Sequence, residues 1–379
     1  MEHSGALIMG IITGILFGIV LHKVGAIRYS RVEGLLLLRD LKIMKFAFIA
    51  IATASISYGL ANIFGFADAL NLHPRIMPYL GIAHLIGGFM FGIAMASAGF
   101  CPGTCVARVG AGKFVAIGGV IGLITGIIIY SMIQPTLVEA GILGQKEKIT
   151  LYGVLGVPYG VLAVAWGTLF IVFAMIADWL DPAKKYVASE GSQDESFISK
   201  VIKREWHWLP SGIWAGLVIV WATAQGEYLG FSGATLALVG WVANMIGHPL
   251  GIVPKISEGI IWHAGLIIGV LPGAFLSAIV SRTFKFDVVP PSFAEAVTPI
   301  PWVRIILVFF AGVFLALGAM IGGGCTTGAF ISAYPTLSVG SMVMSATYFI
   351  VGILTANLIY FGRWSKFVQS IKDAEKVYD

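Results

Sequence analysis

The sequence is poor in charge. Only 11% of its 379 residues are Asp, Glu, Lys or Arg, whereas 58% are hydrophobic, and the mean hydropathy is +0.91. In a typical soluble domain about a quarter of the residues are charged. This shortage excludes a water-soluble fold. The formal net charge of +5 does not indicate nucleic-acid binding, because the basic residues lie in short loops between apolar runs, where they report membrane topology.

Cysteine is scarce as well. The three cysteines, Cys101, Cys105 and Cys325, all lie in or beside apolar sequence, which excludes a disulfide framework. A basic segment before the first apolar run is also missing, so we expect that run to be a retained helix rather than a cleaved signal.

Long apolar runs dominate what is present. Nine runs of roughly 16 to 24 residues have about the length needed to cross a ~30 Å hydrocarbon core. A weaker apolar stretch near 230–247 is bounded by glycine, which favours a short or re-entrant helix. The sequence therefore predicts an all-α, polytopic membrane protein with about nine transmembrane helices plus short re-entrant or broken helices, in contact with membrane lipid. The nine runs lie near 6–21, 43–64, 79–98, 114–133, 158–178, 209–224, 259–281, 302–321 and 338–361.

Basic residues segregate to one side of this nine-span arrangement. Of the 24 Lys and Arg residues, only Arg75, Lys146, Lys148 and Lys255 fall on the opposite side from the others. Loops rich in Lys and Arg face the cytoplasm. We therefore expect a multi-pass protein of the cell (inner) membrane, with the N-terminus outside and the C-terminus cytoplasmic.

The two halves of the chain resemble each other. GFCPGT at 99–104 ends the third run and GGCTTG at 323–328 ends the eighth, and aligning Cys101 with Cys325 also superposes Gly88 on Gly312. Matched segments five spans apart must have opposite orientation, which is the inverted-repeat plan of many transporters. We predict a first membrane repeat over 1–180, a polar cytoplasmic linker over 181–208, and a second, inverted repeat with a cytoplasmic tail over 209–379.

Two glycine-rich breaks carry the candidate functional residues. Pro102 suits the first position of a new helix, so we expect a short helix from near Pro102 to Lys113 and another over about Thr326 to Ala333. Free N–H groups in the first turn of a helix attract anions. The predicted substrate pathway consists of Cys101, Cys325, Cys105, Gly99, Pro102, Gly103, Thr104, Gly323, Gly324, Thr326, Thr327 and Gly328.

Thiols at facing breaks suit a sulfur-bearing anion. The S–H group is a weak donor and sulfur is a soft, polarizable acceptor. An ionised thiol would repel an anion, so we expect neutral thiols, with threonine hydroxyls and backbone N–H groups making the stronger hydrogen bonds. Cys105 is as well explained as a small packing residue. A metal site at Cys101 and Cys105 is disfavoured, because no histidine or carboxylate is near them in sequence.

Two segments, GFMFGIAMASAGFCPGTCVARVGAG (88–112) and GVFLALGAMIGGGCTTGAF (312–330), resemble the YeeE/YedE sulfur-transport family. The resemblance implies short helices that meet at a constricted centre and thiosulfate passed between cysteines, with Cys101 and Cys325 as the central pair. It also implies a cytoplasmic sulfur-carrier protein as a partner. One departure is clear: the family's thiosulfate members have a further cysteine shortly after the first span, and HKVGAIRYSRVEG (22–34) contains none.

Alternatives remain at this point. A membrane sulfurtransferase that forms a cysteine persulfide needs an activated thiolate, and a carrier for another sulfur, selenium or metal species is a third hypothesis.

No ATP-binding motif and no cofactor site are recognised, and nearly all 19 acidic residues fall in predicted loops or tails. A proton relay through a carboxylate within the membrane is therefore disfavoured, and passive or weakly coupled transport is expected. His84 and His263, both within apolar runs, are either functional or buried hydrogen-bonding residues.

Overall fold

Helices make up the fold in the computed structural model, which describes residues 4–144, 147–185, 202–286 and 289–361. Within these ranges the only β pairing consists of two isolated bridges. The α-helices are α1 (Ser4–Lys23), α2 (Tyr29–Leu36), α3 (Lys42–Ile63), α4 (Ile82–Ala98), α5 (Pro102–Gly110), α6 (Val115–Glu139), α7 (Leu151–Leu155), α8 (Tyr159–Leu180), α10 (Trp208–Ala224), α11 (Phe231–Met245), α12 (Glu258–Val280), α13 (Pro291–Ala296), α14 (Pro301–Gly322) and α15 (Val339–Ile359). Three short 3-10 or π segments, η1 (Pro182–Lys185), η2 (Thr326–Ile331) and η3 (Tyr334–Thr336), complete the order.

Each of the nine predicted spans is helical. By length and composition, eight helices in the described part of the chain are able to cross a membrane. The sixth predicted span, α10, is shorter, with 17 residues, and the predicted short helix near 230–247 is α11, with 15 residues. The prediction of an all-helical polytopic membrane protein is confirmed.

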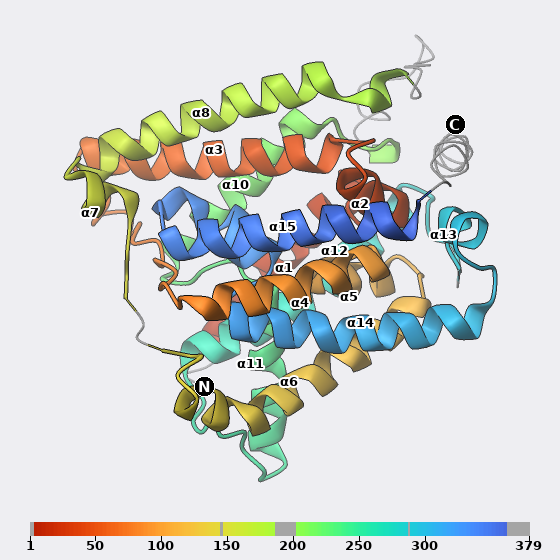
Figure 1. Cartoon of the computed structure of the whole chain (residues 1–379). Helices are drawn as coiled ribbons and strands as arrows, with labels where there is room; N and C mark the ends of the chain where they lie inside the picture. The colour runs from red at the N-terminus through yellow and green to blue at the C-terminus, as the bar shows by residue number, and fades with distance from the viewer. Residues whose placement is uncertain (1–3, 145–146, 186–201, 287–288, 362–379) are drawn as a thin grey trace.

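Most of the long helices cross the molecule in roughly the same direction. In Figure 1, α3, α8, α15, α4 and α14 run across the view, with α7 at one end and α2 and α13 at the other. Helix α3 packs against α8, and α4 packs against both α14 and α15. Most residues of the short helices α2 and α5 are buried.

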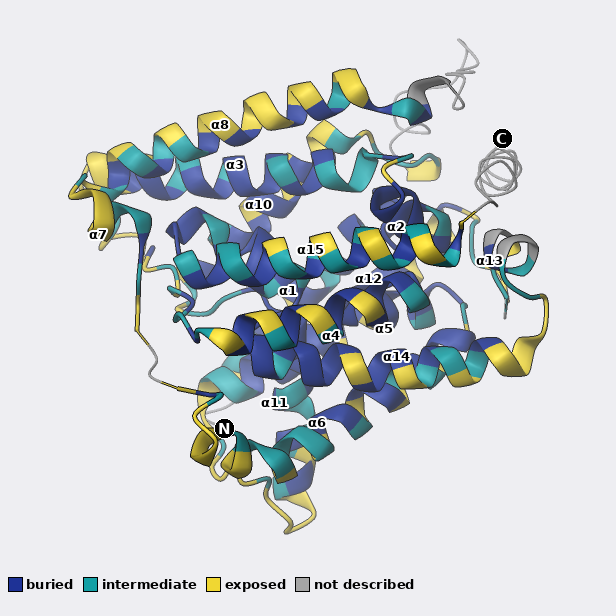
Figure 2. Ribbon diagram, in the orientation of Figure 1, coloured by how far each residue is buried: buried dark blue, intermediate teal, exposed yellow. Residues whose placement is uncertain are grey.

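The outer face of the framework is apolar. Figure 2 shows exposed residues along most of α8, whereas the central helices are largely buried. On α6, Ile117, Ile121, Ile124 and Ile128 are all exposed and recur every three or four residues, so they share one helix face. An apolar exposed face of this kind is the surface that a bilayer covers.

Helix packing in one half of the chain corresponds to packing in the other. Helix α1 packs on α12 as α10 packs on α3, and α4 packs on α15 as α14 packs on α6. The glycines matched in the sequence lie at these contacts: a Cβ on Gly88 would meet Thr347 of α15, and one on Gly312 would meet the Gly119 carbonyl of α6. This correspondence favours a repeat. The opposite orientation of the two halves stays a prediction, and most of the predicted linker, the predicted tail from 362 onward and Lys146 lie outside the described residues.

Candidate functional site

Two long helices end at matched glycines. Helix α4 ends at Gly99, with φ 68°, and α14 ends at Gly323, with φ 91°. Positive φ is readily adopted only by glycine, so both chain reversals depend on the residue type. After each reversal, Cys101 and Cys325 have extended backbone, with φ −108° and −93°, and each cysteine immediately precedes a new helical segment. The predicted breaks and restarts are therefore present, with the second restart a single π-helical segment, η2.

Side-chain hydrogen bonds fix the first break. The Cys101 N–H donates to Thr104 Oγ1 at 2.8 Å, and the same hydroxyl lies 3.4 Å from Cys101 Sγ. Pro102 occupies the first position of α5, as expected. Gly103 is needed for packing, because a Cβ there would lie 2.3 Å from the ring of Phe231 at the start of α11. Thr104 thus positions both the backbone and the thiol of Cys101.

The ends of α4 and α14 are held by side chains from the beginning of the other helix. Arg304, near the start of α14, donates to the carbonyl oxygens of Ser97 (3.2 Å) and Ala98 (2.5 Å). His84, near the start of α4, bonds the Gly322 carbonyl through Nδ1 at 2.8 Å and accepts the Leu80 N–H at Nε2. Since Nε2 accepts, Nδ1 carries the proton and the imidazole is neutral. Both side chains satisfy carbonyl groups that a helix end leaves free.

Cys101 and Cys325 are brought together. Cys101 is 9% exposed and Cys325 is fully buried. The side chain of Cys325 lies near that of Cys101, and the Thr326 side chain lies near the Cys101 thiol. Thr327 is buried beside them, and Gly328 faces Cys325, since a Cβ at Gly328 would lie 3.9 Å from the Cys325 sulfur. The two breaks therefore form one buried site with a thiol from each half of the chain.

Cys105 faces a different direction. Its thiol donates to the Ala116 carbonyl of α6 at 3.4 Å. A Cβ on Gly119 would lie 2.7 Å from the Cys105 sulfur, so α6 passes directly over this residue. Gly324 is likewise in a packing contact, with its Cβ position 3.1 Å from Ala329. The arrangement fits the packing interpretation of Cys105.

A narrow polar cavity of about 10 Å³ lies near the cysteine pair and has room for roughly one water molecule. The Arg75 guanidinium stacks over the Tyr228 ring at 4.2 Å, and Tyr228 also interacts with Cys325. Burial raises the pKa of the neighbouring Glu227 to about 7. From the sequence, Arg75 is predicted only as a loop cation that indicates topology, and no sequence pattern marks Tyr228. The cavity is lined by Pro74, Arg75, Met77, Thr223, Tyr228, Gly328, Ser332 and Ala333.

A buried charged cluster lies on the other side of Cys101. Glu33 on α2 is fully buried, and its Oε1 lies 3.2 Å from the Cβ position of Gly99. Arg108 on α5, 3% exposed, donates through Nε to the Ile27 carbonyl at 2.6 Å and also to the Gly99 carbonyl. Arg304, fully buried, stacks over Tyr29 at 4.7 Å. Arg108 is thus a buried residue that stabilises the break.

Sequence reasoning missed Glu33. The residue was counted among loop acids, yet the segment that contains it folds into α2 and enters the interior. Burial raises the pKa of its carboxyl well above the usual range, although Arg304 and Arg108 act in the opposite direction. One sequence feature points to Glu33: it lies in segment 22–34, where the resemblance leads us to expect a cysteine and none is present.

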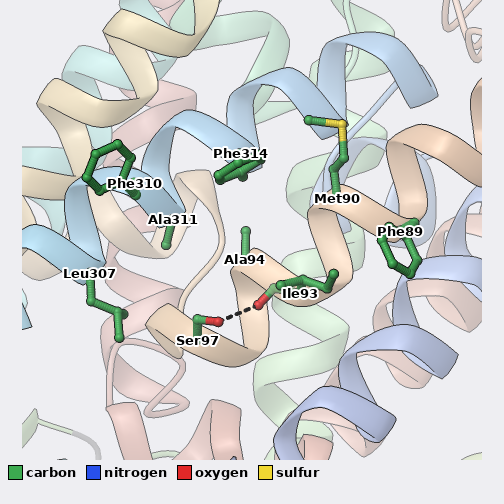
Figure 3. Close-up of a pocket in the computed structure, with 9 residues that line it drawn as sticks. All are labelled: Phe89, Met90, Ile93, Ala94, Ser97, Leu307, Phe310, Ala311 and Phe314. Carbon is green, nitrogen blue, oxygen red and sulfur yellow. Dashed lines mark hydrogen bonds between the residues drawn. The ribbon is translucent and has the colours of Figure 1, made fainter.

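A larger apolar groove, of about 350 Å³, lies between α4 and α14 on their outer side. Figure 3 shows Phe89, Met90, Phe310 and Phe314 around it. The one polar side chain in its lining, Ser97, donates its hydroxyl hydrogen to the Ile93 carbonyl at 2.8 Å. The Ser97 hydroxyl is thus already used as a donor, and the groove has no other polar side chain for an anion. It is distinct from the cysteine site.

Histidine His263 also has a packing role. Its Nδ1 bonds the Gly259 carbonyl at 2.8 Å, one turn earlier on α12, and lies 3.4 Å from a Glu227 oxygen. The ring packs 4.6 Å from Tyr228. His263 thus supports the wall of the outer cavity.

Sequence comparisons with known proteins identify relatives of this chain. A curated relative from Spirochaeta thermophila, "Thiosulfate transporter TsuA", is 26% identical over 373 residues, covering 93% of this chain and 99% of the relative. A second relative of the same name, from Escherichia coli K12, is 24% identical and covers 85% of this chain and 86% of its own length. The family model described as "Sulphur transport" matches residues 28–355. This match includes both breaks and most of the sequence, and it shows that the chain belongs to the sulphur transport family.

Proposed function

We propose that this protein takes up thiosulfate, or a closely related sulfur anion, across the inner membrane. The observation that carries the proposal is the meeting of two buried thiols, Cys101 and Cys325, from opposite halves of the chain. Membership in the sulphur transport family and the names of the two relatives support the substrate class.

The chemistry of the site suits a partly dehydrated anion. The thiols offer weak S–H donors and polarizable sulfur to the terminal sulfur of thiosulfate. Thr104 and Thr326 supply hydroxyl donors, and the first-turn N–H groups of α5 add partial positive charge. Each contact is weak enough to exchange, so the ion is handed from one cysteine to the other. The proposal includes no chemical step, and the ion leaves intact.

The route follows the groups on either side of the pair. The ion is attracted by Arg75, reaches Cys325 past Tyr228 and Gly328, moves to Cys101 and leaves toward the side of Glu33. The sorting of basic residues supports an external position for the first side, with the N-terminus outside and the C-terminus in the cytoplasm. An inverted repeat over 1–180 and 209–379 would account for the paired breaks. A cytoplasmic sulfur-carrier protein as the acceptor rests on family resemblance.

Uptake of labelled thiosulfate into liposomes that contain the purified protein tests the proposal. We expect Cys101→Ala and Cys325→Ala each to reduce uptake by at least about 100-fold, because each removes one of the two transfer groups. Cys105→Ala is the matched control and retains uptake within about twofold, since its thiol faces α6. Size-exclusion profiles establish that all three variants are folded.

Full uptake by both cysteine variants would rule out the thiol transfer. Competition by sulfate, sulfite and selenate defines the substrate range. Mass spectrometry of the protein after exposure to thiosulfate separates transport from sulfur transfer, because a persulfide on Cys101 or Cys325 would indicate the sulfurtransferase mechanism instead.

A further inference from the structure

The charged cluster on the inner side of Cys101 contains a carboxyl group without a partner. Neither oxygen of Glu33 has a hydrogen bond of normal geometry, although the residue is fully buried. The Tyr29 hydroxyl is near enough to interact with it, but it also forms a 2.5 Å hydrogen bond with Tyr360. A buried polar group left unpaired is destabilising, so its presence here requires an explanation beyond packing.

Two guanidinium groups face the same carboxyl. Arg108 approaches from α5 and Arg304 from α14, and both interact with Glu33 electrostatically. Each arginine is held in place by backbone carbonyls at the break, and Arg304 Nε has no partner. Among the described residues, the other titratable groups that interact with Glu33 are the hydroxyls of Tyr29 and Tyr360. Apart from the proton on Glu33, the cluster has two fixed positive charges.

Charge balance then depends on Glu33. With an ionised carboxylate the buried cluster has a net charge of +1, and with a neutral carboxyl it has +2. Uncompensated charge is costly away from water. A doubly charged anion such as thiosulfate therefore matches the cluster best when Glu33 is protonated, whereas an ionised Glu33 competes with the anion for the same guanidinium groups.

The position of the cluster fits the route of the ion. Glu33 lies against Gly99, two residues before Cys101, and Arg108 is bonded to the Gly99 carbonyl. An ion that leaves Cys101 away from Cys325 therefore meets these groups next. The segment that lacks a cysteine thus supplies a carboxyl and a tyrosine at this place.

We propose that Glu33, Arg108 and Arg304 form an inner binding site for a dianionic sulfur oxyanion, in which the anion binds together with one proton on Glu33. The proton comes from cytoplasmic water when the anion arrives and returns to it when the anion leaves, so no electron or covalent bond is involved. Loss of the proton restores the Glu33 carboxylate, which then displaces the anion. This inference rests on the proposed function.

Calorimetric titration of the purified protein with sodium thiosulfate tests the site. In two buffers of different ionisation enthalpy, both at a pH above the pKa of Glu33 in the anion-free protein, the wild type should take up about one proton per anion bound, and its affinity should fall about tenfold per pH unit in that range. Glu33→Gln should bind without proton uptake and with an affinity independent of pH. Glu33→Asp should restore proton uptake, which a purely structural role for Glu33 would not predict.

The matched control is Glu258→Gln, an exposed carboxyl at the start of α12 that should leave the proton uptake unchanged. Unchanged proton uptake in folded Glu33→Gln would overturn the inference. A wild type that binds and transports no thiosulfate would instead contradict the proposed function, so the two failures are distinguishable.

A double variant tests the arginines. In the Glu33→Gln background, Arg304→Gln should weaken thiosulfate binding at least about tenfold, since it removes one charge of a buried pair. Unchanged binding in that folded double variant would also count against the site.

Discussion

The two sides of the cysteine pair are built differently. On the side that we propose is external, the exposed Arg75 stacks on Tyr228 and a small polar cavity reaches Gly328. On the inner side, Arg108 and Arg304 are buried and bonded to backbone carbonyls around the break. An exposed cation attracts an ion from water at little structural cost, whereas a buried one must be supported by the fold. The difference favours capture on one side and a closed, positively charged barrier on the other.

The largest contrast should appear when one arginine is removed from each side. Arg304→Met leaves the α4 carbonyls without their donor and removes one of the two cations near Glu33, so we expect a loss of about 3–5 kcal/mol in stability. Arg75→Met should change stability by less than about 0.5 kcal/mol. Thermal unfolding in detergent measures both. Equal losses would mean that the two sides do not differ in the way described.

The two glycine reversals offer a second contrast. A Cβ at Gly99 would lie 2.3 Å from the rigid ring of Tyr29, whereas one at Gly323 would lie 2.8 Å from the flexible end of Met77. Both alanine variants suffer from positive φ, but Gly99→Ala should lose about 2–4 kcal/mol and Gly323→Ala about 1–2 kcal/mol. Gly81→Ala, with φ 57° and open space around it, isolates the backbone contribution. A lower melting temperature for Gly323→Ala than for Gly99→Ala would contradict the tighter packing around Gly99.

Removal of the outer cation alone should affect capture. With Arg75→Gln we expect the apparent KM for thiosulfate to rise about three- to tenfold with little change in the maximal rate. The wild-type KM should rise with ionic strength, and that of the variant should respond less. Arg282→Gln, on the predicted cytoplasmic side, is the control. An unchanged KM for Arg75→Gln would show that Arg75 has no role in capture.

The smallest effect concerns external pH. Burial raises the pKa of Glu227 to about 7, so this carboxyl is neutral in acid and becomes negatively charged as the external pH rises through 7. A new negative charge near Tyr228 repels the anion, so the apparent KM should increase about twofold between about pH 6 and pH 8. Glu227→Gln should abolish that increase. An identical pH response in the variant would assign it to another group.

Local sequence signals were sufficient for the breaks. Pro102 predicts a helix start, and the matched positions of Gly99 and Gly323 predict the reversals, because these residue types have strong backbone preferences. Apolar length predicts the long helices, because a run of about 20 apolar residues matches the thickness of the hydrocarbon core. The approach of Cys101 to Cys325 followed once the two halves were aligned.

The inner cluster depended on contacts that sequence patterns do not encode. Helix α2 has eight residues, among them Arg31 and Glu33, and reads as a loop because its burial comes from the surrounding helices. Arg304 looked like a topological cation at the start of α14, yet it satisfies carbonyls at the end of α4. Such contacts between residues far apart in the sequence follow from the tertiary arrangement, so they become visible only in the folded structure.

The exchange of end caps between α4 and α14 has a mechanical consequence. Each helix supplies the side chain that completes the terminus of the other, and their backbones touch where a Cβ on Gly87 would lie 2.3 Å from the Gly322 nitrogen. Sliding or tilting one of them against the other would break both caps at once. We therefore expect α4 and α14 to keep their relative position during turnover, and side chains around them to move instead.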